Sequence, residues 1–124
     1  MKQGDQAMET DIDLSGEWDV TYEEGRGERK ASLLTLVQNG NCIMGRDEGG
    51  GRAYHVEGVV VGGKTLKARY MALAATAQND SSNGELILTL QDGGKSLRGS
   101  YIYYSGNAPY TLSYVAIYRG PCRF

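Results

Sequence analysis

The sequence predicts an all-β protein, a single eight-stranded antiparallel up-and-down β-barrel with no substantial helix. The chain of 124 residues holds 18 glycines and nine tyrosines against one Trp and one Phe. Glycine supplies the positive φ of tight turns, and tyrosine favours strands. From Ser15 onward, short segments of strand-forming residues alternate with turn signals. Tight turns and longer connections also take alternate places along the chain, which is expected of a closed meander.

The polar residues 1–12 are expected to form a flexible N-terminal tail, and residues 13–124 a single barrel domain. Residues 72–77 have helical propensity but are few, so we expect a loop there with at most one helical turn. The expected strands, in chain order, are 16–22, 31–38, 41–46, 53–61, 64–72, 85–91, 95–104 and 110–119.

Alternation of side chains gives each strand an inward and an outward face. Setting the single tryptophan inward fixes the first strand, and apolar side chains at every second position fix the others. The expected inward residues are Trp18, Val20 and Tyr22; Met44 and Arg46; Tyr54, Val56 and Gly58; Leu66, Ala68 and Tyr70; Leu86, Leu88 and Leu90; Leu97, Gly99, Tyr101 and Tyr103; and Tyr110, Leu112, Tyr114 and Ala116.

The lengths of the connections between strands predict that the two ends of the barrel differ. Asn39-Gly40, Gly62-Gly63 and Asp92-Gly93-Gly94 are tight hairpin turns with glycine where φ is positive. The alternate connections, roughly 23–30, 47–52, 73–84 and 105–109, are expected to be longer. Odd and even connections of a meander emerge at opposite ends. We therefore expect a floor closed by tight turns and a mouth surrounded by long loops.

Composition excludes several classes of function. The net charge of −2 gives no basic field for nucleic acid. No apolar run approaches the ~20 residues of a membrane helix, and the first residues lack the apolar segment of a signal peptide. We expect a cytoplasmic protein without a membrane span. A single histidine, His55, and two distant cysteines, Cys42 and Cys122, argue against a zinc site, and we expect no cofactor. Free thiols and a disulfide both remain open for the cysteines.

A short motif carries a family resemblance. Leu14-Ser15-Gly16-Glu17-Trp18 resembles the Gly-x-Trp signature of the calycins, the group of lipocalins, fatty-acid-binding proteins and avidins. In length and lack of helices the chain is most similar to avidin-like barrels, but it lacks the several tryptophans of their biotin sites. The resemblance implies that Trp18 lies at the floor, where a basic residue of the last strand, here Arg119, packs across it. A cation–π contact would stabilise that pair by roughly 0.5–2 kcal/mol.

Strand parity places most of the inward tyrosines toward the mouth, above apolar side chains at the floor. This arrangement suits a partly apolar or aromatic ligand. The candidate ligand-binding residues are Tyr22, Met44, Arg46, Tyr54, Tyr70, Tyr101, Tyr103, Tyr110 and Tyr114. Two alternatives stay open: side chains can fill an eight-stranded barrel, and Arg46 can be solvated beside Asp47 and Glu48 rather than anchor a ligand.

Apolar residues are also expected on the outer faces: Leu33, Val37, Val59, Val61, Ile102, Val115 and Ile117. Monomeric proteins rarely expose contiguous patches of such residues. We therefore expect a homodimer or a higher homo-oligomer.

The sequence favours a non-catalytic protein that binds a small hydrophobic or aromatic molecule. One alternative is a protein-interaction module, such as a barrel-type protease inhibitor that uses its N-terminal tail. Another is a barrel-enclosed isomerase or cyclase with Tyr as general acid and Arg46 as charge stabiliser. No catalytic residue is assigned, because the expected inward faces hold no Asp or Glu.

Overall fold

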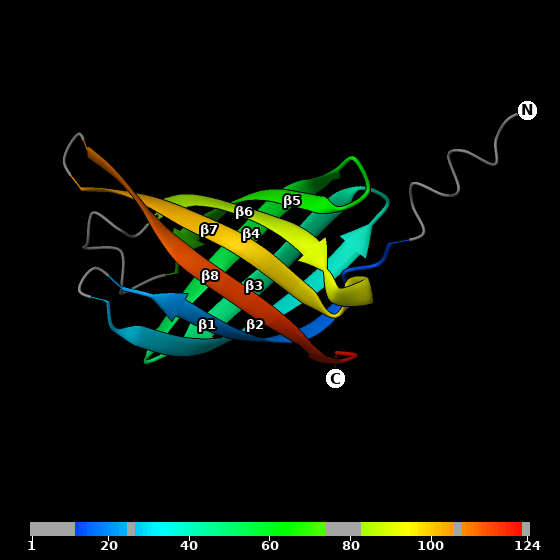
Figure 1. Ribbon diagram of the computed structural model, residues 1–124, viewed down its shortest axis with the longest axis horizontal. Helices are drawn as coiled ribbons and strands as arrows, with labels where there is room; N and C mark the ends of the chain where they lie inside the picture. The colour runs from blue at the N-terminus through cyan, green and yellow to red at the C-terminus, as the bar shows by residue number, and fades with distance from the viewer. Residues whose placement is uncertain (1–11, 25–26, 74–82, 106–107, 123–124) are drawn as a thin grey trace, which may run out of the picture.

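The computed structural model describes residues 12–24, 27–73, 83–105 and 108–122 of the chain. Eight strands follow one another and close into a barrel in which each strand is hydrogen-bonded to its sequence neighbours and the last to the first (Figure 1). The strands are β1 (Gly16–Glu23), β2 (Arg29–Asn39), β3 (Cys42–Gly49), β4 (Arg52–Val61), β5 (Thr65–Ala72), β6 (Asn83–Gln91), β7 (Ser96–Ser105) and β8 (Ala108–Gly120). The predicted fold class is confirmed.

Closure depends on the antiparallel pairing of β1 with β8, which aligns Asp19 with Ile117 and Val20 with Ala116. The register shifts between Glu17 and Trp18, where a β-bulge leaves one extra residue in β8. The only helical turn in the described residues is a three-residue 3-10 turn at Asp92–Gly94, between β6 and β7.

The floor is the end of the barrel that carries the even-numbered connections. Gly40, Gly62 and Gly63 adopt φ of 63°, 63° and 75° there, as tight hairpins require. The first turn lies one residue later than expected, because Asn39 and Cys42 pair and leave Gly40 and Asn41 as the loop. Independently of this shift, every side chain of β3 lies on the opposite face from the one predicted, because cross-strand partners share a face and the inward Leu34 and Leu36 of β2 pair with Asp47 and Gly45.

The mouth, at the opposite end, is less uniform than the sequence suggests. The expected long connection 47–52 is wrong: β3 continues to Gly49, β4 begins at Arg52, and the turn is Gly50-Gly51 with φ of 59° and 79°. Acidic and glycine residues at 47–51 resemble a loop in composition, but two consecutive positive φ values are the requirement of a two-residue turn.

The core fills the floor half of the barrel. Trp18 is 1% exposed, and its indole N–H donates a hydrogen bond of 3.0 Å to the Leu14 carbonyl oxygen. The other large side chains that are fully buried are Leu34, Leu36, Ile43, Val56, Leu66, Leu88 and Leu97. They come from β2 to β7, and with Trp18 from β1 they form one apolar base.

Gln38 ties the segment before β1 to the floor. Its side-chain oxygen accepts a hydrogen bond from the Leu14 amide at 2.7 Å, and its side-chain nitrogen donates to the carbonyl oxygens of Ile12 and Gly40. Ile12, expected as the last residue of the tail, packs against the core. Residues 1–11 of that expected tail lie outside the described residues.

Replacing Gln38 with alanine is expected to lower the free energy of unfolding by about 1–2 kcal/mol, because three hydrogen bonds of a partly buried amide are lost. Chemical denaturation followed by the fluorescence of Trp18 measures the change. Gln91→Ala, at the exposed end of β6, is the matched control and should change stability little. Equal effects of the two substitutions would contradict a closing role for Gln38.

The structure corrects the expected contact between Trp18 and Arg119. Tyr118 packs against the indole instead, with ring centroids 5.2 Å apart in an edge-to-face arrangement. The Arg119 side chain is 50% exposed, and its guanidinium lies 3.6 Å from the Asp19 carboxylate on the outer face. Alternation from Tyr114 and Ala116 explains the difference, since it brings residue 118 inward and residue 119 outward.

Candidate functional site

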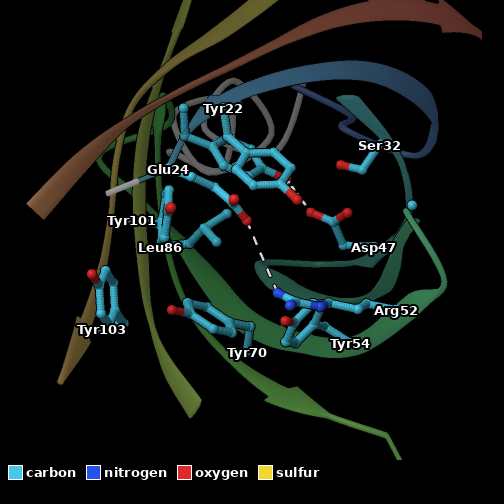
Figure 2. A pocket seen from close by; sticks show the side chains of 12 residues that line it. Tyr22, Glu24, Ser32, Asp47, Arg52, Tyr54, Tyr70, Leu86, Tyr101 and Tyr103 are labelled. Carbon is cyan, nitrogen blue, oxygen red and sulfur yellow. Dashed lines mark hydrogen bonds and ion pairs between the residues drawn. The ribbon is translucent and has the colours of Figure 1, made fainter. Parts of the chain in front are cut away.

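A cavity of about 190 Å³ lies inside the mouth half of the barrel (Figure 2). Six tyrosines dominate its wall, and charged or polar side chains occupy one side. The lining residues are Tyr22, Glu24, Ser32, Asp47, Gly49, Arg52, Tyr54, Tyr70, Leu86, Tyr101, Tyr103 and Tyr114. The alternative of a completely filled barrel therefore does not apply to the mouth half.

The tyrosines gather from five strands because each occupies an inward position near the mouth end. Tyr22 and Tyr70 lie near the ends of β1 and β5, and Tyr54 near the start of β4. Tyr101 and Tyr103 share the inward face of β7, and Tyr114 is buried on β8. Six of the nine candidate ligand-binding residues thus line one cavity.

Met44 and Arg46 do not line the cavity, and their predicted inward positions are wrong. Met44 is 54% exposed, and Arg46 forms an ion pair with Glu48 on the outer face. Ile43 is buried in their place. Pairing with β2 is the physical reason: Asp47 lies opposite Leu34, which is buried inside the barrel, so Asp47 shares this inward face and lines the cavity.

Tyr110 also lies outside the lining of the cavity. It is 47% exposed, and its ring stacks on Tyr103 with centroids 5.2 Å apart. It therefore supports a lining ring at the mouth instead of contacting the cavity itself.

The tyrosine rings form one continuous cluster. Tyr101 is its centre, with edge-to-face contacts of 5.8 Å to Tyr22, 6.3 Å to Tyr70 and 6.3 Å to Tyr114. Tyr54 joins through Tyr70, their rings being 5.5 Å apart and nearly perpendicular. Each such pair contributes roughly 0.5–1.5 kcal/mol beyond burial. The rings therefore support one another and do not depend on a bound molecule for their positions.

Three phenol hydroxyls of this cluster donate to the protein. Tyr70 donates to the Ile102 carbonyl oxygen at 3.3 Å, and Tyr101 donates to the carbonyl oxygen of Glu23. Tyr114 donates to the Asp47 carboxylate at 2.6 Å. Each of these three phenol oxygens can still accept a hydrogen bond through its lone pairs, but its single hydrogen is already donated.

Asp47 is the least expected member of the site. Burial raises the pKa of its carboxyl above the ordinary value of 3.8, while the hydroxyls of Ser32 and Tyr114 act in the opposite direction. The Ser32 hydroxyl oxygen is buried beside this carboxyl without a hydrogen bond of good geometry to any described group. On the polar side of the cavity, the Ser32 hydroxyl thus lacks a hydrogen-bond partner of good geometry in the described residues.

Glu24 and Arg52 face each other across the cavity, with 4.0 Å between the carboxylate oxygen and the guanidinium nitrogen (Figure 2). Both are partly exposed. Glu24 follows β1 and Arg52 begins β4, so the sequence separates them and composition alone gives no indication of the pair.

Burial raises the pKa of Tyr22, Tyr70, Tyr101 and Tyr114 above the ordinary value of 10.0, and neighbouring negative charges or phenols add to the effect. The four phenols are therefore neutral at physiological pH. They can accept hydrogen bonds and present ring faces, but they offer no phenolate nucleophile or base.

Within the described ranges, no group of three His, Cys, Asp or Glu side chains could hold a metal ion. Among these same residues, no helix has the length and apolar character to cross a membrane. Cys42 is exposed, Cys122 is half-buried, and both are free thiols.

Comparison with known proteins identifies the fold alone. No family model matches the chain, and no curated protein matches it. Among solved structures, it is similar to a redesigned beta barrel, b11L5F_LGL, with a TM-score of 0.64 and 13% identity over 86% of this chain and 91% of that one. It is also similar to EF1p2_mFAP2b bound to DFHBI, with a TM-score of 0.63 and 14% identity over 95% of this chain and all of that one.

Proposed function

We propose that this barrel is a non-catalytic binding protein that takes a small, partly apolar or aromatic molecule into the tyrosine-lined cavity. The observation that carries the proposal is the preformed cavity, which lies above a fully packed apolar floor. Its volume of about 190 Å³ is close to that of a ~150 Å³ cavity that accommodates benzene. It lies below the ~300–1,000 Å³ of ordinary ligand pockets. The ligand is accordingly of about one ring in size.

The structural comparison supports this proposal in general terms. EF1p2_mFAP2b has a similar barrel and is bound to DFHBI. Because identity is only 14%, nothing about the ligand is carried over to this chain. The comparison supports only the expectation that a barrel of this fold can hold a small molecule.

Tyr54→Ala and Tyr103→Ala are each expected to weaken binding of a hydrophobic probe dye, and of hits from a small-ligand library, by at least fivefold. Each substitution removes a ring from the cavity wall. Fluorescence titration measures the dye, and calorimetry measures the hits.

Tyr104→Ala is the matched control for these variants. Tyr104 is next to Tyr103 on β7, is 43% exposed and is not part of the lining. Its replacement should leave affinity unchanged. If Tyr54→Ala and Tyr103→Ala also leave every affinity unchanged, the cavity is not the binding site.

We further propose that the chain is a calycin of the lipocalin or avidin type. Its support is the Gly16-x-Trp18 motif at the start of the first strand of an eight-stranded barrel, with the indole buried at the floor. The outward position of Arg119 departs from the pattern, and Tyr118 takes the place of the basic side chain beside the indole.

Assembly into a homodimer or a larger homo-oligomer remains part of the proposal. Val37, Met44, Val59, Val61 and Ile117 are large apolar side chains exposed on the outer faces. Val37 pairs with Met44 across β2 and β3, so part of this surface is continuous. Burial of such a surface between copies would remove apolar area from water.

One observation favours an isomerase- or cyclase-type enzyme as a second candidate function. The buried Asp47 carboxyl and the Tyr114 hydroxyl are hydrogen-bonded at the cavity wall, where a raised carboxyl pKa suits proton transfer. Recovery of a bound ligand in altered form, detected by chromatography and mass spectrometry, would favour the enzyme over the binding protein. The interaction-module alternative depends on the N-terminal tail, nearly all of which lies outside the described residues.

A further inference from the structure

Several oxygens of the cavity wall can only accept further hydrogen bonds. The hydroxyls of Tyr70, Tyr101 and Tyr114 each donate their only hydrogen to a protein oxygen, so towards a ligand they can act only as acceptors. Asp47 and Glu24 add carboxyl oxygens to the same lining. A ligand that satisfies these particular oxygens brings hydrogen-bond donors or positive charge, since acceptors cannot satisfy one another. The lining also holds donors, among them the hydroxyls of Tyr22, Tyr54 and Tyr103. A preference for a cation therefore depends on the charged side chains of the wall.

The cavity wall also carries more acidic than basic side chains. Two carboxyl groups, Glu24 and Asp47, face one guanidinium, that of Arg52. Arg52 is paired with Glu24 on the partly exposed side of the cavity. Asp47 has no basic partner among the described residues, and its hydrogen-bond donor is a neutral phenol. The unpaired charge therefore lies at the better-buried carboxyl.

The aromatic wall complements a cation as well. A positive charge is attracted to the negatively polarised faces of aromatic rings within about 6 Å, and aromatic cages recognise quaternary ammonium groups in this way. Neighbouring rings of the cluster are turned by 69–88° in their edge-to-face pairs. Walls of such rings present faces as well as edges to the enclosed space (Figure 2).

We propose that the ligand of this cavity is a small organic cation, an amine or quaternary ammonium compound with an apolar or aromatic body. Its charged nitrogen lies beside Asp47, and its apolar body lies among the tyrosine rings toward Leu86. This inference rests on the proposed function, because it names the chemical class of molecule that the same cavity takes.

The state of Asp47 without ligand agrees with this assignment. Its buried carboxyl lacks a counter-ion, and burial raises its pKa. The charged and titratable groups that face it are Tyr114 from β8, Tyr22 from β1, Tyr54 and Arg52 from β4, and Glu24. Glu48, on the outer face of β3, adds a nearby negative charge. Of these only Arg52 is basic, and it is engaged with Glu24. A bound cation would supply the missing opposite charge.

The test compares three probes of similar size: phenyltrimethylammonium, its uncharged isostere tert-butylbenzene, and the anion benzoate. Calorimetric or NMR titration of the unmodified protein should show phenyltrimethylammonium binding at least tenfold more tightly than either of the others. Asp47→Asn keeps the shape of the side chain and should weaken phenyltrimethylammonium at least tenfold, while tert-butylbenzene changes less than twofold. Asp19→Asn, on the outer face, should leave both affinities unchanged.

The outcomes separate this inference from the proposed function. If tert-butylbenzene binds as tightly as the ammonium compound and Tyr54→Ala weakens it, the cavity binds ligands but does not select cations, and the inference fails. If benzoate binds most tightly, Arg52 and not Asp47 is the anchor, and the inference fails again. If none of the three probes binds, both proposals are overturned. The comparison of probes on the unmodified protein keeps the test decisive even if Asp47→Asn does not fold.

Discussion

Replacing Trp18 with alanine is expected to lower the free energy of unfolding by about 3–5 kcal/mol, more than any other single change considered for this protein. The indole is 1% exposed, packs against Tyr118 and donates a hydrogen bond to Leu14. Truncation removes the transfer free energy of the ring and leaves a void that the surrounding barrel wall cannot close, because its backbone is fixed by hydrogen-bonded neighbours.

The measurement needs circular dichroism or calorimetry, since Trp18 is the only tryptophan. Arg119→Ala is the informative control. If Arg119 forms only an exposed ion pair with Asp19, Arg119→Ala should lower the free energy of unfolding by at most ~1 kcal/mol. A cation–π contact with the indole of Trp18 would predict a larger loss. A loss below ~1.5 kcal/mol for Trp18→Ala would show that the floor is not the main source of stability.

Tyr114→Phe is expected to lower the free energy of unfolding at neutral pH by about 1.5–3 kcal/mol, the usual contribution of a hydrogen bond to a charged group. The substitution keeps the buried ring but removes the hydroxyl that donates to the Asp47 carboxylate. That carboxylate then loses its only donor of good hydrogen-bond geometry among the described residues.

The pH dependence of this loss follows from the raised pKa of Asp47. A carboxyl whose pKa is raised on folding destabilises the folded state above that pKa, and the penalty disappears below the unfolded value near 3.8. Removal of the phenol hydroxyl raises the pKa further and enlarges the penalty. The difference between Tyr114→Phe and the unmodified protein should therefore be largest near pH 7.5, shrink as the pH falls through the raised pKa of Asp47, and be smallest below about pH 4.

Urea denaturation at both pH values measures the effect. Tyr104→Phe, which removes an exposed hydroxyl from the outer face of β7, is the control and should show no such dependence. A loss for Tyr114→Phe that is the same at both pH values would mean that Asp47 is not ionised in the folded protein.

Most of the barrel could be predicted because inward and outward positions alternate wherever strands carry apolar side chains. In β1, β5 and β6, residues such as Val20, Leu66 and Leu88 are buried where the alternation places them. The gathering of tyrosines at one end also followed from parity alone, since it needs only the order and direction of the strands.

β3 shows where this reasoning fails. Its inward positions include Gly45, Asp47 and Gly49, which offer no apolar pattern, while Met44 on the outer face suggests the wrong one. The pairing of Asp47 and Gly45 with the buried Leu34 and Leu36 of β2 decides the inward face instead. The sequence does hold one signal for an inward Asp47. Gly45, Asp47 and Gly49 occupy alternate positions of the strand, directly before the turn glycines Gly50 and Gly51.

The expected position of Arg119 failed for a different reason. It came from the family resemblance, whereas the alternation along β8 already pointed the side chain of residue 118 toward the indole. The ion pair of Glu24 with Arg52 could not be predicted at all, because it depends on how two strand ends approach across the mouth.

Closure of the sheet has a consequence for how this protein can meet other polypeptides. Because β1 and β8 are paired, every strand has a neighbour on both sides, and the sheet offers no row of unpaired amides to an incoming strand. Edge-to-edge association, a common route to aggregation and to peptide capture, is thereby blocked. Copies or partners that meet the barrel wall must dock through side chains on its convex outer surface, so the specificity of such contacts is encoded in those side chains and not in the backbone.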